Sequence, residues 1–314
     1  MSGGEVSGSE SERDVVVVGG GPAGTAAGVF TARYGLDTVV FDRGAGSLDR
    51  CAFLANYPGF PAGIDVATFQ ELCHEQAREA GCAVVADLVE RIRRPSDAGD
   101  GFVVETQDGR RVTAERVIAA TRYGGECLRP LGGDEMFETH EHDGEEHEHF
   151  DPDYSDADGR TPSDGLYVAS PGGQRDVQAV VAAGRGAHVA RALIEDRRAE
   201  RGYPPDLAKH YDWLRPESEF EGEWDERGRW REWFDERVPE DHELDEETLD
   251  ALREECVDDA FATRRSEDEI AARTDRAHRR LARELDTEAV LETLDTGTVL
   301  DALDDDAIRG YLDT

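Results

Sequence analysis

A glycine-rich turn between an apolar run and an alanine-rich segment is the feature that most constrains the fold of this chain. Residues 14–18 read Asp-Val-Val-Val-Val, which is typical of a strand buried in a parallel sheet. The turn Gly19-Gly-Gly21-Pro-Ala-Gly24 follows at once, and the small residues of 23–34 favour a helix packed closely on that strand. A second apolar run, 38–41, ends at Asp42. This order predicts a βαβ unit at the start of an α/β fold.

The glycine spacing suits the pyrophosphate of a dinucleotide. Gly19 makes the tight turn, Gly21 lets phosphates approach the backbone, and Gly24 lets the helix pack on the strand. Pro22 and Ala23 begin a helix whose N-terminal N–H groups attract the phosphates. Asp42 is placed to accept hydrogen bonds from the adenosine ribose hydroxyls. The alternative is a tight glycine turn without a ligand, and the pattern itself does not choose between FAD and NAD.

Weaker patterns predict the rest of the first half. We expect a helix over 67–80, a strand over 83–86, a hairpin of 102–106 and 111–113 around Asp108-Gly109, and a buried strand over 116–120. A further strand, 165–169, and an alanine-rich helix, 177–194, follow. Residues 138–164 lose the apolar pattern and gain acid and histidine. We interpret them as an acidic, His-rich loop.

Several of these segments, in this order and spacing, resemble the FAD domain of the thioredoxin reductase family. They are the glycine turn, Gly46-Ser-Leu48, Asn56-Tyr-Pro-Gly-Phe-Pro61, Val117-Ile-Ala-Ala-Thr121, and 165–169 with 178–184. The resemblance implies a doubly wound, Rossmann-like FAD-binding domain with a small antiparallel insertion and FAD as the cofactor. Asn56, Thr121 and Gln178 are the predicted flavin-side contacts. The remaining predicted cofactor-binding residues are Arg43, Ser47, Leu48, Val85, Ala120, Gly173 and Ala179.

The chain also departs from that family. Its five cysteines contain no C-x-x-C pair, no second glycine fingerprint follows the first, and residues 131–165 are too few for an NADPH domain. Arg122 replaces the glycine of the family's A-T-G stretch, and residues 170–173 replace its A-G-D. We therefore expect an FAD-dependent oxidoreductase whose electrons come from a separate small-molecule or protein donor, with catalytic residues unassigned. The alternatives are a non-catalytic FAD-binding scaffold or regulatory protein and, third, an NAD-binding module.

Charge excludes two classes of partner. The chain has 72 acidic and 35 basic residues, a net charge of −37, and a single lysine, Lys209. Such an excess opposes binding to nucleic acid or to an anionic membrane. Disorder and a folded protein of a salt-loving cytoplasm both explain the charge. The apolar runs favour the second, and the scattered cysteines and the absence of a long apolar stretch indicate a reducing, cytoplasmic setting.

We expect three parts: a disordered acidic tail (1–13), the FAD-binding domain (14–195), and a charged α-helical extension (196–314) that contains all four tryptophans. Asp245 and Ser266 are predicted helix caps within the extension. Its helices offer a surface for a homo-oligomer. We predict no metal site, because a solvated loop does not preorganise the histidines of 138–164. Cys51 and His188 are interpreted as packing residues.

Overall fold

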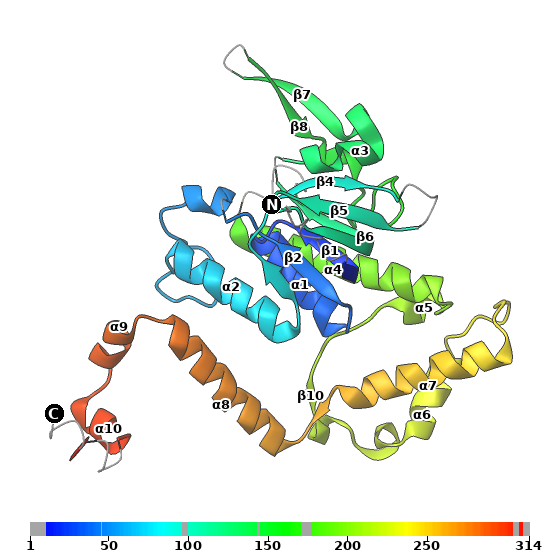
Figure 1. The fold of residues 1–314 in the computed structure, drawn as a ribbon. Helices are drawn as coiled ribbons and strands as arrows, with labels where there is room; N and C mark the ends of the chain where they lie inside the picture. The colour runs from blue at the N-terminus through cyan, green and yellow to red at the C-terminus, as the bar shows by residue number, and fades with distance from the viewer. Residues whose placement is uncertain are drawn as a thin grey trace, which may run out of the picture. The chain divides into compact units, whose positions relative to one another are not determined.

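The computed structural model describes residues 11–44, 46–95, 100–122, 124–142, 145–170, 178–303 and 308–309. The first part of the chain forms a seven-stranded mixed sheet with helices (Figure 1), which confirms the predicted fold class. The strand order is β3-β2-β1-β6-β5-β4, and β9 also pairs with β6. The strands are β1 (Ser11–Val18), β2 (Thr38–Phe41), β3 (Ala83–Val85), β4 (Val89–Arg93), β5 (Phe102–Thr106), β6 (Arg111–Ala120) and β9 (Leu166–Ser170).

Strand β1 lies between two parallel partners, β2 and β6, and its valine side chains are buried on both faces of the sheet. Val15 and Val17 contribute to one core, and Val16 and Val18 to the other. The expected acidic tail was too long, because β1 begins at Ser11 and its first residues pair with Val112 to Ala114 of β6. Strand β6 is likewise longer than expected, since the segments 111–113 and 116–120 form one continuous strand.

The edge of β6 that faces away from β1 has two partners. Antiparallel β5 pairs with its first part, Arg111 to Ala114, and parallel β9 with its second part, Val117 to Ala120. The first pairing builds the predicted small antiparallel unit with β4. The second places the return strand β9 directly beside the point where β6 ends.

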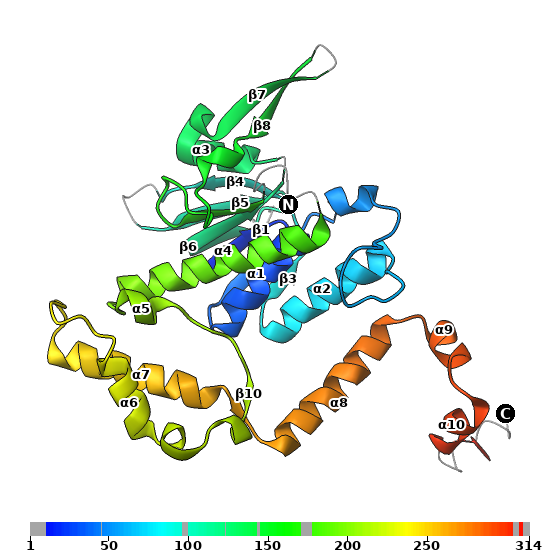
Figure 2. The ribbon, with the colours of Figure 1, turned by 180° about the vertical axis from the view of Figure 1, so that it is seen from behind.

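Helices cover one face of this sheet. They are α1 (Pro22–Arg33), α2 (Val66–Ala80) and α4 (Ala179–Glu200), and Figure 2 shows α4 lying across the sheet beside α1. The core beneath them combines Val15, Val17 and Ile118 with Ala27 and Leu193. On the other face, β4, β5, the 3-10 turn η2 (Glu126–Leu128) and Phe150 enclose a second core.

The segment expected to be an acidic loop, residues 138–164, contains most of a β-hairpin, so that expectation was wrong for residues 138–142 and 145–150. Strand β7 (Phe137–His142) pairs with β8 (Glu145–Phe150) and extends away from the sheet (Figure 1). The pairing is fixed at its base, where Phe137 and Phe150 are cross-strand partners and their rings meet edge to face. Arg129 of α3 (Arg129–Gly132) lies over the Phe137 ring.

Residues after α4 form a smaller apolar cluster. Helices α5 (Pro205–Ala208), α6 (Arg227–Asp235) and α7 (Glu246–Ala262) bury Tyr203, Leu207, Phe234 and Leu252. Asp245 caps α7 as predicted. Trp224, Trp230 and Trp233 pack against one another, whereas Trp213 is 71% exposed. Packing therefore accounts for three of the four tryptophans.

The chain divides into two compact units, one up to Arg264 and one from Arg265. The short strand β10 (Arg215–Pro216) precedes this division, and the two residues of β11 (Arg264–Arg265) stand on either side of it. The second unit contains α8 (Glu267–Glu284), α9 (Thr287–Glu292) and α10 (Thr296–Asp301), and Ser266 and Glu269 form the predicted capping box of α8. The domain limit expected at residue 195 falls inside α4, which ends at Glu200. That limit stays a prediction. None of the helices in the described segments has the length and apolarity needed to span a membrane.

Helix α4 supplies a test of how closely it packs on α1. A Cβ added at Gly186 would overlap the backbone of Ala23, whereas one added at Gly184, on the same helix, meets nothing within 4 Å. We expect Gly186→Ala to lower the free energy of unfolding by about 1–3 kcal/mol through overpacking. Gly184→Ala is the matched control and should be neutral or stabilising by up to about 1 kcal/mol. Urea unfolding measures both, and equal effects would contradict the close approach.

Candidate functional site

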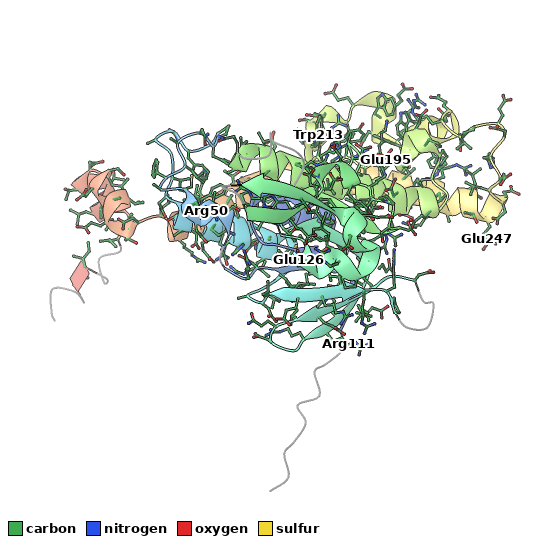
Figure 3. The ribbon with its side chains drawn as sticks, turned by 90° about the horizontal axis from the view of Figure 1, so that it is seen from above. Arg50, Arg111, Glu126, Glu195, Trp213 and Glu247 are labelled. Atoms are coloured by element: carbon green, nitrogen blue, oxygen red, sulfur yellow. The ribbon has the colours of Figure 1, made fainter. Side chains whose placement is uncertain are left out.

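A cavity of about 1320 Å³ opens at the carboxyl ends of β1, β2 and β6, where open α/β sheets bind their ligands. Its lining comes from the turns after these strands, from the 3-10 turn η1 (Ser47–Arg50), from α2 and from the start of α4. Figure 3 labels Arg50 and Glu126, two charged residues that line it from η1 and η2. The volume exceeds that of most small-molecule pockets and suits an extended ligand.

The glycine turn forms the floor of this cavity through contacts that exclude side chains. Gly19 has a φ of +105°, and a Cβ there would overlap the carbonyl oxygen of Ala120. A Cβ at Gly24 would overlap the carbonyl oxygen of Gly19. The helix α1 thus starts directly on the turn, as the spacing predicts.

Gly21 faces open space, unlike Gly19 and Gly24. A Cβ there would meet nothing within 4 Å, and the residue lines the cavity at the N-cap of α1. No side chain caps this helix, so its first-turn N–H groups are available to an anion. The turn therefore fits a pyrophosphate, with Gly21 as the point of closest approach.

Asp42 lies at the other side of the turn, at the end of β2. Its Oδ1 accepts a hydrogen bond from the Gly44 N–H at 3.0 Å, and its Oδ2 is 3.2 Å from His74 Nε2. The hydrogen bond with His74, together with that from Gly44, lowers the pKa of Asp42 despite its partial burial. A carboxylate at this place is charged and ready to accept ribose hydroxyls.

His74 and Gln70 belong to the cavity but were not among the predicted site residues. Both lie on α2, four residues apart and hence on one face of the helix. Gln70 Nε2 donates to the Gly20 carbonyl at 2.6 Å, and His74 Nε2 is 3.0 Å from the same oxygen. Their i, i+4 spacing was visible in the sequence, but their contact with a turn about 50 residues away was not.

The predicted flavin-side residues also meet. Asn56 Nδ2 donates to Gln178 Oε1 at 2.7 Å, which joins the segment after η1 to the start of α4. Thr121 follows β6, and its hydroxyl donates to the Gly124 carbonyl at 2.8 Å. Asn56, Thr121 and Gln178 all line the cavity, so residues far apart in the chain surround one space.

Most of the other predicted cofactor-binding residues line the same cavity. These are Gly19, Gly21, Pro22, Ala23, Asp42, Arg43, Ser47, Leu48, Ala120 and Ala179. Gly24 lies behind the turn, consistent with its expected packing role. Val85 is not among the lining residues, because it packs against the core beneath β3. Gly173 lies outside the described residues.

Arg122, which replaces the family's glycine, has a φ of +63°. Left-handed backbone of this kind favours glycine and costs other residues about 1–2 kcal/mol. Arg122 lines the cavity, and its N–H donates to the Ser170 carbonyl at 3.0 Å, which holds the turn in place. Arg122 therefore adopts a backbone conformation that glycine adopts at lower cost.

Two cysteines line the cavity in different environments. Cys51 is exposed, so its interpretation as a buried packing residue was wrong. Burial raises the pKa of Cys127 to about 12, so this thiol is protonated at neutral pH. His188, also interpreted as a packing residue, is half exposed and pairs with Asp158 at 2.7 Å. It is not among the cavity-lining residues.

No group of three or more metal-ligating side chains occurs within the part of the chain that the structure describes. The hairpin places His140 opposite His147 in the backbone register. The predicted absence of a metal site stays a prediction.

Comparison with known proteins finds a match for the first half of the chain. Residues 13–158 match the family profile of the pyridine nucleotide-disulphide oxidoreductases. Over these residues the chain is similar to that superfamily. The thioredoxin reductase of Helicobacter pylori is 32% identical over 111 residues, or 34% of this chain and 35% of the relative. That of Aquifex aeolicus is 34% identical over 110 residues, or 34% of this chain and 33% of the relative.

The chain spans about a third of the length of these relatives of the superfamily. Among solved structures, a thioredoxin reductase from Gloeobacter violaceus has a TM-score of 0.50 at 19% identity, covering 65% of this chain and 98% of its own. This likeness supports the fold.

Substitutions at Gly21 and Gly24 are expected to affect stability differently, because only Gly24 is needed for close packing of the backbone. Gly24→Ala should destabilise the protein by about 1–3 kcal/mol, because the new Cβ overlaps the Gly19 carbonyl. Gly21→Ala should change stability by less than about 0.5 kcal/mol, because its backbone is extended and the space is open. Thermal and urea unfolding of the ligand-free protein compare the two. A Gly21 variant as unstable as the Gly24 variant would refute the assignment of their roles.

Proposed function

We propose that the chain is an FAD-dependent oxidoreductase of the thioredoxin reductase-like type, with the cofactor in the cavity beside the glycine turn. One observation carries this proposal. The cavity joins a pyrophosphate-type turn and a ribose-type carboxylate, Asp42, to a polar pair, Asn56 and Gln178, contributed by two other segments. Relationship to the pyridine nucleotide-disulphide oxidoreductases supports it.

FAD is favoured over NAD because the segments that line the cavity beyond the turn and Asp42 resemble the flavin side of the thioredoxin reductase family. The turn and Asp42 suit the ADP half, which both cofactors share. The Asn56–Gln178 pair and Thr121 line the same cavity from the segment after η1, the start of α4 and the end of β6. These positions coincide with the segments that resemble the flavin side of the family.

The electron donor is proposed to be a separate molecule. Between β6 and β9 the described residues form α3, the β7–β8 hairpin and short turns rather than a second α/β domain. The flavin supplies the redox chemistry, while the chain binds it, orients it and limits its contact with water. We further propose that the protein works in a salt-rich cytoplasm, where concentrated ions screen its net charge of −37.

A non-catalytic FAD-binding scaffold is the second candidate, and the thiols of the cavity favour it. Cys127 is held as a neutral thiol, and Cys51 is exposed with no second cysteine beside it in the sequence. Such an arrangement does not supply the paired thiols of dithiol exchange. In this case the flavin stabilises the fold and no donor reduces it.

Purification in high salt, followed by absorbance spectroscopy, tests the proposal. We expect a flavin spectrum at one FAD per chain that bleaches under anaerobic conditions with NADH, NADPH or a reduced protein carrier. Bound flavin that none of these reduces favours the scaffold. A colourless protein that takes up no added FAD would overturn both FAD functions.

The glycine turn offers a matched pair of variants for the same assay. Gly21→Val should lower FAD content at least tenfold, because the side chain projects into the space where phosphates approach. Gly184→Val changes a helical glycine that is not among the cavity-lining residues and should keep FAD content near that of the original protein. Unchanged FAD in the Gly21 variant would refute the site.

A further inference from the structure

His74 stands between three polar groups at the cavity floor, and they make conflicting demands on its Nε2 atom. Asp42 Oδ2 lies 3.2 Å away and the Gly20 carbonyl oxygen 3.0 Å away, and both accept hydrogen bonds. Gln70 Nε2 lies 2.8 Å away and also donates to the Gly20 carbonyl. Two of these neighbours need a donor at Nε2, and the third needs an acceptor.

The proton on Nε2 decides between these partners. When Nε2 carries a proton, it donates to Asp42 and Gly20, and the Gln70 amide must turn its second N–H elsewhere. When Nε2 carries no proton, its lone pair accepts a hydrogen bond from the Gln70 amide and repels the two neighbouring oxygens. Asp42 then has no hydrogen bond from His74. In the charged imidazolium both ring nitrogens carry protons, so only the first arrangement exists.

The Asp42 carboxylate links the protonation state of His74 to the binding of a ligand. Oδ1 accepts from the Gly44 N–H and Oδ2 from His74, which leaves each oxygen a lone pair for one ribose hydroxyl. The Gly20 carbonyl belongs to the phosphate-binding turn itself. A single imidazole on α2 therefore contacts both the ribose subsite and the pyrophosphate turn.

We propose that His74, protonated at Nε2, is the positioning residue of the adenosine ribose subsite and makes FAD binding dependent on pH. This inference rests on the proposed function of the cavity. His74 does not touch the redox end of the cofactor and acts through Asp42. Its charge also balances that of Asp42 beside the incoming pyrophosphate.

The charged neighbours determine the direction of the pH effect. Asp42 faces His74 from the end of β2 with Arg43 close by, and on α2 the nearest charges are Arg78 and its partners Glu71 and Glu75. The hydrogen bond with Asp42 raises the pKa of His74 above its ordinary value of 6.5, against the opposing effects of burial and of Arg78. The ion pair with Asp42 is thus complete below pH 6.5 and is lost as the pH rises through the folded-state pKa of His74. Above that pKa the ring is neutral and carries a single proton, which is shared between the Nε2 and Nδ1 tautomers.

The test measures the FAD dissociation constant of the full-length apoprotein by flavin fluorescence between pH 5.5 and 9. We expect the dissociation constant to rise about tenfold as His74 loses its positive charge, because its attraction to Asp42 and to the pyrophosphate is then lost. His74→Gln puts a neutral amide donor near the Nε2 position. It should bind FAD within a few-fold of the original protein at low pH and remove the rise. His74→Leu should bind about tenfold more weakly throughout.

The matched control is His188→Gln, which alters another His–Asp pair away from the cavity and should keep the pH dependence. An unchanged rise in His74→Gln would overturn the inference while FAD binding stands. If the original protein binds no FAD, the proposed function fails, and NMR titration of the apoprotein still tests the pair. Asp42→Asn should then lower the pKa of His74, and an unmoved pKa would refute the coupling.

Discussion

Backbone segments around the start of α1 approach one another more closely than a residue with a Cβ allows. Gly24 meets the carbonyl of Gly19, Gly19 meets that of Ala120, and Gly186 of α4 meets that of Ala23. These contacts join β1, β6, α1 and α4 at one point beneath the cavity. Thr121 follows β6 and Gln178 directly precedes α4, so their positions depend on these contacts. Asp42 follows β2, which pairs with β1.

Local sequence signals predicted this region well because the constraints are local. The valines of β1, the glycine turn and the alanines of α1 are neighbours in the chain, and each restricts the conformation of the next. The same holds for the helix caps Asp245 and Ser266, whose partners lie three residues away. Patterns of this kind can be read without knowing the tertiary fold.

The contacts that escaped prediction depend on distant residues. His74 lies 32 positions after Asp42, and nothing in the pattern of α2 shows which turn its polar face contacts. The β7–β8 hairpin was hidden because only Phe137 and Phe150 are apolar among its paired residues, and they meet 13 positions apart. Arg122 showed a departure from the family, whereas its left-handed backbone could be found only in the structure.

The acidic composition has a limited structural role. Arg201 contacts Glu255, and Arg227 contacts Asp258, but exposed pairs of this kind stabilise a protein by only about 0–1 kcal/mol each. Arg198 differs, since its side chain is 3% exposed, lies over the Tyr203 ring and reaches Asp259 of α7. It links α4 to the helices that follow, so one buried arginine contributes more to the architecture than many surface pairs.

The two partners of β6 define a place where the chain tolerates replacement. The chain leaves the sheet after Ala120 and returns at Leu166, and the backbone bonds Val117–Gly165 and Arg122–Ser170 hold exit and re-entry side by side. Because these bonds hold the two ends together, the segment between them can be replaced by one of another length. The strands around the cavity therefore keep their register independently of the length of the segment between Ala120 and Leu166.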